Sequence, residues 1–163
     1  DTLDLGKEKN PFRSSLRVKL PHKIIDTMQL RQSFVGKIIN DRVSYLSSKK
    51  NNLYIYTNTS SLGRYTISRD TLEPEIKPIN FKNNSSIKGK RSLRLRLKDE
   101  LSGIKKYSSY INGIWALFEY EPKSNLIFHN LSDGIINNGE NELIIKYEDG
   151  VGNKGIYKTK VFY

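Results

Sequence analysis

Apolar and polar residues alternate along most of this sequence with a period of two, which is the pattern of half-buried β-strands. The clearest case is the segment Leu93-Arg94-Leu95-Arg96-Leu97, whose leucines would face a core while its arginines face water. A second alternating segment covers residues 143–147. Residues 24–30 fit either a helical turn or a loop, and no segment has the sustained period of a long helix. The pattern therefore predicts an all-β chain.

Turn signals divide the expected strands into two groups. The segment from Arg69 to Pro74 has no apolar period, and its proline biases Glu73 towards extended geometry. We therefore predict two small Ig-like β-sandwich modules in tandem, 1–70 and 71–163, with about seven antiparallel strands in the second. The first group is short for a sandwich, which leaves open that its first strand lies upstream. The strands expected in it cover 16–20, 33–39, 43–46, 53–57 and 63–67.

The second module has the stronger local signals. Asn112-Gly113 is a dipeptide typical of a two-residue hairpin, and it leads into an expected strand over 115–120. Pro78 marks an edge strand, because proline cannot donate a hydrogen bond to a neighbouring strand. The residues predicted to form its core are Leu93, Leu95, Leu97, Ile111, Leu143, Ile145 and Val161.

Composition limits the chemistry. Only 36% of the 163 residues are apolar, which suits two small cores better than one large core. The absence of cysteine excludes disulfides, thiol catalysis and cysteine-bound zinc. No run of 18 apolar residues occurs, so we expect no transmembrane helix.

The net charge of +11 raises the question of an anionic partner. Because the basic residues are spread along strands and no helix-turn-helix, RNP or zinc-finger pattern occurs, we expect no nucleic-acid partner. An anionic polymer of the cell envelope fits this distribution, and so does a surface whose charge only maintains solubility.

Two turns with Asp and Gly follow the two clearest strands. They are Asp99-Glu100-Leu101-Ser102-Gly103 and Glu148-Asp149-Gly150-Val151-Gly152-Asn153. In a sandwich both would project from the same end, where oxygen ligands from two loops can hold calcium. The candidate ligands are Asp99, Glu100, Asp149 and Asn153. The alternative is that each aspartate caps its own turn.

These two turns, together with the segment from Tyr110 to Tyr120, resemble the C-terminal Ig-like region of Bacteroidetes proteins whose N-terminal part is an M23-family (LytM-type) zinc peptidase. The resemblance is good from about residue 60 to 163 and loose before that. It implies a non-catalytic accessory region of a secreted cell-wall peptidase that positions the enzyme or binds the envelope. Its implied partners are an upstream catalytic domain and peptidoglycan, and its location would be periplasmic, outer-membrane-associated or extracellular.

Catalysis by the chain itself is not expected. M23 peptidases use a His-x-x-x-Asp pair and a His-x-His pair, whereas this sequence has two histidines in all, His22 and His129. Three convergent ligands are needed for a catalytic zinc ion, so we expect zinc only in an upstream domain and no cofactor here. A Gly-x-Ser-x-Gly elbow for a nucleophilic serine does not occur either.

Aromatic and basic residues provide two candidate binding features. Tyr110, Trp115 and Tyr120 can stack on sugars, which would suit an independent carbohydrate-binding or adhesin-like module, or they can simply cover the core. A basic field on one outer sheet face would attract polyanions; alternatively, its charges only prevent pairing between sheets of different molecules. Its members are Arg94, Arg96, Lys98, Lys146, Lys158 and Lys160.

Overall fold

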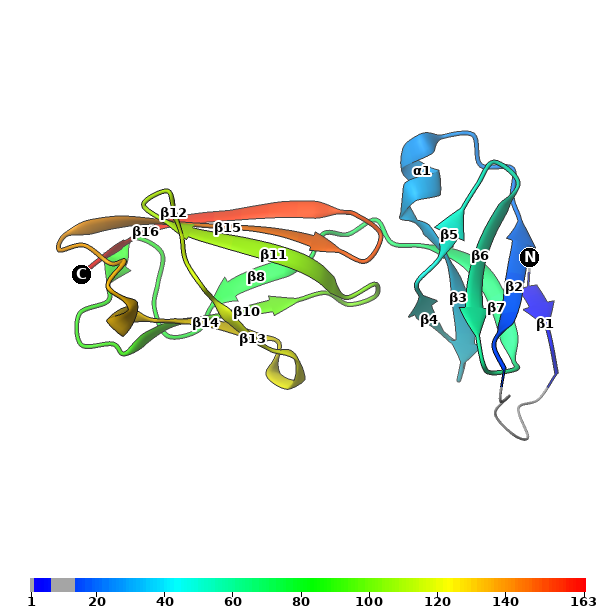
Figure 1. The fold of residues 1–163 in the computed structure, drawn as a ribbon, viewed down its shortest axis with the longest axis horizontal. Coiled ribbons are helices and arrows are strands. Elements are labelled where there is room, and N and C mark those ends of the chain that lie inside the picture. Colours follow the sequence, from blue (N-terminus) through cyan, green and yellow to red (C-terminus); the bar gives the residue numbers. More distant parts are fainter. Residues whose placement is uncertain (1, 7–13) are drawn as a thin grey trace. The chain divides into compact units, whose positions relative to one another are not determined.

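The computed structural model describes residues 2–6 and 14–163, which form two compact units (Figure 1). The first unit ends at Leu72 and also includes the short segment Gly150–Gly152, and the second comprises Glu73–Asp149 and Asn153–Tyr163. The main boundary therefore lies between Leu72 and Glu73. The sequence placed this boundary two residues earlier. The regular secondary structure of both units is almost entirely β-strand, as the alternating pattern predicted.

The described residues of the first unit form seven strands in two sheets, with the orders β1-β7-β3-β4 and β2-β6-β5. Between the sheets lies a core of Val18, Leu20, Val35, Ile55 and Tyr65. Its strands are β1 (Thr2–Asp4), β2 (Leu16–Pro21), β3 (Ser33–Ile39), β4 (Arg42–Leu46), β5 (Lys49–Lys50), β6 (Tyr54–Thr59) and β7 (Arg64–Arg69).

The segment that fitted either a helical turn or a loop forms a short helix, α1 (Thr27–Gln32). Asp26 precedes it in extended conformation, and its side chain accepts a hydrogen bond from the backbone N–H of Gln29 at 2.7 Å. Because the first N–H groups of a helix have no partner within the helix, this capping bond stabilises its start.

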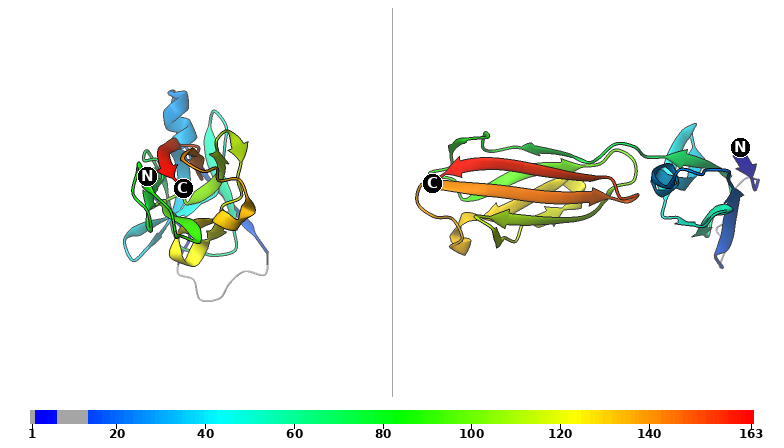
Figure 2. Two further views of the ribbon diagram at one scale, coloured as in Figure 1. Left: turned by 90° about the vertical axis from the view of Figure 1, so that its left-hand side faces the viewer. Right: turned by 90° about the horizontal axis from the view of Figure 1, so that it is seen from above.

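The second unit is a two-layer β-sandwich, and its strands are β8 (Glu75–Pro78), β9 (Ser85–Ser86), β10 (Ser92–Lys98), β11 (Ile104–Ile111), β12 (Ile114–Trp115), β13 (Glu119–Glu121), β14 (Leu126–Asn130), β15 (Glu140–Asp149) and β16 (Lys154–Phe162). Two 3₁₀ turns, Pro122–Ser124 and Leu131–Asp133, flank β14. One sheet has the order β13-β14-β10-β8 and the other β12-β11-β15-β16-β9. Figure 2 shows β15 and β16 side by side in the second of these layers. About seven antiparallel strands were expected, whereas nine form and β9 pairs parallel to β16.

All seven predicted core residues of the second unit are at most 1% exposed. Each lies on a strand whose alternate residues face the opposite sheet, which explains why the period of two identified them. Pro78 lies on β8 at the edge of its sheet, as its missing N–H predicted.

The hairpin at Asn112-Gly113 forms, with both residues at positive φ, but the strand expected after it does not continue to residue 120. The chain pairs with β11 only through β12 and then crosses to the other sheet, where it forms β13. Ala116 and Phe118 are buried along this crossing. The expectation of one strand over 115–120 was therefore wrong, because burial of these two side chains draws the segment between the sheets.

Candidate functional site

The candidate site is the outer face of the five-stranded sheet in the second unit. Alternation along β15 directs Leu143, Ile145 and Tyr147 into the core and leaves Ile144 and Lys146 on the outer face. The strand register places Tyr110 of β11 and Lys158 of β16 on either side of Ile144.

Trp115 lies directly opposite Tyr110 at the β12 edge of this face, and its side chain is 59% exposed. The ammonium nitrogen of Lys146 lies 5.6 Å from the centre of the Tyr110 ring, within the range of a cation–π interaction. Two aromatic rings and a cation therefore share one region of the sheet. We call this surface the aromatic–basic face and define it by Tyr110, Trp115, Ile144, Lys146 and Lys158.

Tyr120, the third predicted stacking residue, does not belong to this surface. It lies on β13 in the other sheet, half-buried against Tyr107, with the two ring centres 6.2 Å apart. Tyr120 therefore packs against the core, whereas Tyr110 and Trp115 are brought together.

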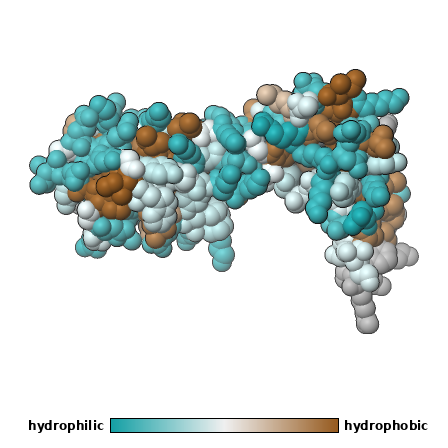
Figure 3. Space-filling view, turned by 45° about the horizontal axis from the view of Figure 1, so that its top comes forward, coloured by the Kyte–Doolittle hydropathy of each residue, from teal (hydrophilic) through white to brown (hydrophobic). Residues whose placement is uncertain are grey.

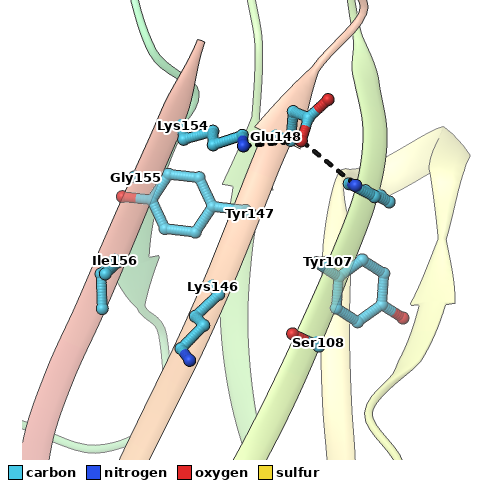
Figure 4. Close-up of a pocket in the computed structure, with 9 residues that line it drawn as sticks. Tyr107, Ser108, Lys146, Tyr147, Glu148, Lys154, Gly155 and Ile156 are labelled. Atoms are coloured by element: carbon cyan, nitrogen blue, oxygen red, sulfur yellow. Dashed lines mark ion pairs between the residues drawn. The ribbon is translucent and has the colours of Figure 1, made fainter. Parts of the chain in front are cut away.

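A hollow of about 350 Å³ adjoins the aromatic–basic face (Figure 4). Its lining comes from β11, β15 and β16 and includes Ser108, Lys146 and Ile156. Ser108 contributes only a short side chain to this lining. Gly155 also belongs to the lining, but the space beside its Cα on the core side is filled by the ring of Tyr147. Ser108 and Ile156 were not identified from the sequence, because only the pairing of three strands brings them together.

Glu148 forms one end of the hollow and is surrounded by lysines. Its carboxylate lies 3.2 Å from the ammonium groups of both Lys105 and Lys106, and 3.8 Å from that of Lys154. Burial of the carboxyl opposes its ionisation, but the hydrogen bonds and positive charges of Lys105 and Lys106 outweigh burial, so the pKa of Glu148 is lowered. One carboxylate thus faces three ammonium groups, and this end of the hollow remains positively charged.

The aromatic–basic face has positive charge without an acidic partner. Among residues 2–6 and 14–163, neither Lys146 nor Lys158 has a carboxylate within ion-pair distance. Lys160, further along β16, pairs with Glu140 at 2.9 Å, and this carboxylate raises the pKa of the Lys160 ammonium group.

The six residues predicted to form one basic field are divided between two sheets. Arg94, Arg96 and Lys98 lie on β10 in the four-stranded sheet, whereas Lys146, Lys158 and Lys160 lie on β15 and β16 in the five-stranded sheet. The prediction of a single face was therefore wrong. Alternation shows which side chains point outward from a strand, but not which sheet the strand joins.

The two turns predicted to be neighbours do lie together, with carboxylate oxygens of Asp99 and Asp149 within 4.8 Å of each other. Asp99 accepts hydrogen bonds from the N–H groups of Leu101 and Gly103, at 3.0 and 2.7 Å. Asp149 accepts from the backbone and side-chain amides of Asn153, at 2.8 and 2.7 Å. Both aspartates therefore cap their own turns, which is one of the two roles that the sequence left open.

Glu100 and Asn153 complete the set of predicted calcium ligands. Glu100 is exposed and pairs with Lys98 at 2.6 Å. The side-chain nitrogen of Asn153 donates to Asp149, so the amide side chain presents a donor to this carboxylate.

The two histidines make local structural contacts. His22 and Asp26 have the four-residue separation of a His-x-x-x-Asp pair, but Asp26 caps α1, and His22 bonds the backbone of Ile24 and Asn51 at 3.1 and 2.8 Å. His129 is buried, stacks on Phe118 and bonds the carbonyl oxygen of Leu117 at 2.8 Å.

The exposed apolar side chains of the second unit form separate brown patches within a polar surface, on the side seen in Figure 3.

In the part of the chain that the structure describes, none of the helices has the length and apolar character needed to cross a membrane.

Comparison with known proteins found similarity only to solved structures. No protein-family model matches the sequence, and no curated protein matches it. The endo-β-1,4-mannanase from Thermotoga petrophila aligns with 57% of this chain and 20% of its own, at 20% identity and a TM-score of 0.46. The fibronectin(III)-like modules of Clostridium thermocellum CbhA align with 96% of this chain and 92% of theirs, at 12% identity and a TM-score of 0.42. The assignment to the Ig-like β-sandwich class rests on the sheet topology described above.

Proposed function

We propose that this chain is a non-catalytic accessory region that holds a larger protein on an anionic glycan of the cell envelope. The observation that carries this proposal is the aromatic–basic face, where exposed Trp115 lies opposite Tyr110 and Lys146 lies against the Tyr110 ring. An open sheet face of this kind suits an extended polymer better than a small substrate.

The chemistry of the face matches a sugar polymer that carries acidic groups. Indole and phenol rings offer apolar surface to the C–H groups of a pyranose ring while their polar edges remain hydrated. Lys146 and Lys158 have no acidic partner in the described chain, so they are available to carboxylates of the polymer. Stacking would select sugar rings, and the lysines would select a glycan that carries carboxylates over a neutral one.

The parent protein is proposed from the resemblance to the C-terminal region of M23-type peptidase proteins. In that setting the catalytic zinc domain lies upstream, and the glycan is peptidoglycan. The location would be periplasmic, outer-membrane-associated or extracellular. The same face equally suits an independent carbohydrate-binding module, since the Trp115–Tyr110 pair requires no enzyme beside it.

Trp115 supplies a direct assay, because it is the sole tryptophan of the sequence. Titration with soluble peptidoglycan fragments should change its fluorescence, and the protein should cosediment with purified sacculi. Lys146→Glu with Lys158→Glu should weaken retention about tenfold at low salt, which corresponds to about 1.4 kcal/mol.

A matched control is available on the other sheet of the same unit. Arg94→Glu with Arg96→Glu changes the net charge by the same amount, but on β10, and should leave retention nearly unchanged. Equal loss in both variants would indicate a response to net charge alone and would overturn the proposed site. Equal binding to double-stranded DNA, or no change in Trp115 fluorescence with any fragment, would overturn the glycan assignment.

A further inference from the structure

In the three-stranded sheet β2-β6-β5 of the first unit, all the charged residues are basic. Alternation along β2 buries Val18 and Leu20 and leaves Arg17 and Lys19 exposed. In the register of the sheet, Lys19 and Lys49 lie on either side of Tyr56. The three strands contain no Asp or Glu.

Aromatic rings hold two of these cations. The guanidinium carbon of Arg17 lies 5.7 Å from the centre of the Tyr56 ring, and the Lys19 ammonium nitrogen lies 5.9 Å from that of Tyr54. The Arg17 side chain also donates a hydrogen bond to the Asn58 side chain at 3.1 Å. In the described part of the chain, Arg17, Lys19 and Lys49 have no carboxylate within ion-pair distance.

Contacts of this kind restrict the conformations of the Arg17 and Lys19 side chains. A cation packed against a ring has fewer conformations to lose when it binds an anion, so less conformational entropy opposes binding. The lack of acidic residues means that a polyanion meets no repulsion along the strands. Charge complementarity therefore favours an acidic polymer over a protein with a mixed surface.

We propose that this surface, defined by Arg17, Lys19, Lys49, Tyr54 and Tyr56, is a second binding face for the same acidic glycan. The inference rests on the proposed function of the aromatic–basic face, and it makes the chain bivalent. Two weak faces on one chain slow release from a long polymer, because the second contact re-forms at high effective concentration before the first is lost. A glycan fragment that is short enough to occupy only one face is not held longer by the presence of the other face.

The test uses the full chain with Arg17→Glu and Lys19→Glu. A matched control carries Arg42→Glu and Arg69→Glu, which make the same charge change on exposed positions of the other sheet of the unit. Circular dichroism and thermal unfolding establish that both variants fold. Release from sacculi is followed by dilution at low salt, and binding of short muropeptides is followed by Trp115 fluorescence.

The Arg17/Lys19 variant should dissociate from sacculi about tenfold faster than the control, with the muropeptide titration of Trp115 unchanged. Equal release rates for the variant and its control would overturn the second face while leaving the proposed function intact. The second face would also be overturned if only the variant with Lys146→Glu and Lys158→Glu lost binding to sacculi. If double-stranded DNA displaced the protein from sacculi as effectively as soluble peptidoglycan, the face would be a general polyanion surface, and the glycan assignment would be overturned.

Discussion

The ring of Tyr147 on β15 covers Gly155, which lies directly opposite it on β16, so closely that a Cβ atom at position 155 would lie 2.2 Å from the ring atom Cε2. Tyr147 belongs to the core cluster, and β15 is the central strand, with β16 beside it, of the sheet that carries the aromatic–basic face. The missing side chain at residue 155 is therefore a packing requirement of the sheet.

Gly155→Ala should lower the free energy of unfolding by about 1–3 kcal/mol, because the added methyl group forces the ring or the strand to move. Urea denaturation followed by circular dichroism measures this change. In a Tyr147→Ala background the same substitution should cost much less, since the colliding ring is gone. A full cost in both backgrounds would contradict the steric explanation.

Glu148→Gln should remove a pH-dependent part of the stability. The pKa of Glu148 in the folded state is lowered, so its carboxylate stabilises the fold above the ordinary pKa of 4.5, and this contribution is lost as the pH falls through the folded-state value. Because its lysine partners are largely exposed, the variant should lose only about 1 kcal/mol at neutral pH. The difference from the native chain should shrink as the pH falls below 4.5 and vanish once the pH lies well below the lowered folded-state pKa.

Glu140→Gln is the matched control for this experiment, since Glu140 pairs with a single lysine, Lys160, and both side chains are about half exposed. Its effect on unfolding should be small at every pH. A Glu148→Gln effect that stays constant from acid to neutral pH would be inconsistent with the ion-pair explanation.

Two leucines of the second unit should respond very differently to truncation. Leu95 is fully buried between the sheets, and Leu95→Ala should cost about 2–5 kcal/mol through lost burial and the cavity left behind. Leu117 is 51% exposed, and Leu117→Ala should change stability by only about 0.5 kcal/mol. Chemical denaturation of both variants measures the loss of unfolding free energy at each position. Similar losses at the two positions would refute the assignment of the core.

Tyr107, Tyr147 and Tyr157 should ionise above the ordinary tyrosine range, because burial raises the pKa of each phenol. The folded state disfavours the phenolate, so stability should fall as the pH rises above about 10. Absorbance titration near 295 nm should show a late phase that is smaller in Tyr147→Phe. An unchanged titration curve in that variant would mean that Tyr147 ionises like an exposed phenol.

Local sequence determined the clearest strands of the second unit and which of their side chains face the core. Leu93, Leu95 and Leu97 face the core because side chains of a strand alternate between its two sides, whatever the strand pairs with. The Asn112-Gly113 turn is equally local, since both residues adopt positive φ at little cost. The outer positions of Arg94 and Lys146 followed from the same alternation.

Tertiary structure alone decided which of these faces became neighbours. β10 and β15 have similar patterns, yet pairing with different strands places Arg94 and Lys146 on different sheets. The crossing at Ala116 and Phe118 placed Tyr120 against the core and left Trp115 exposed beside Tyr110. The outer face of β2-β6-β5 likewise needed the register that sets Lys19 beside Tyr56. Such pairings join residues far apart in sequence, and they depend on how whole strands bury their apolar sides together, which no local pattern specifies.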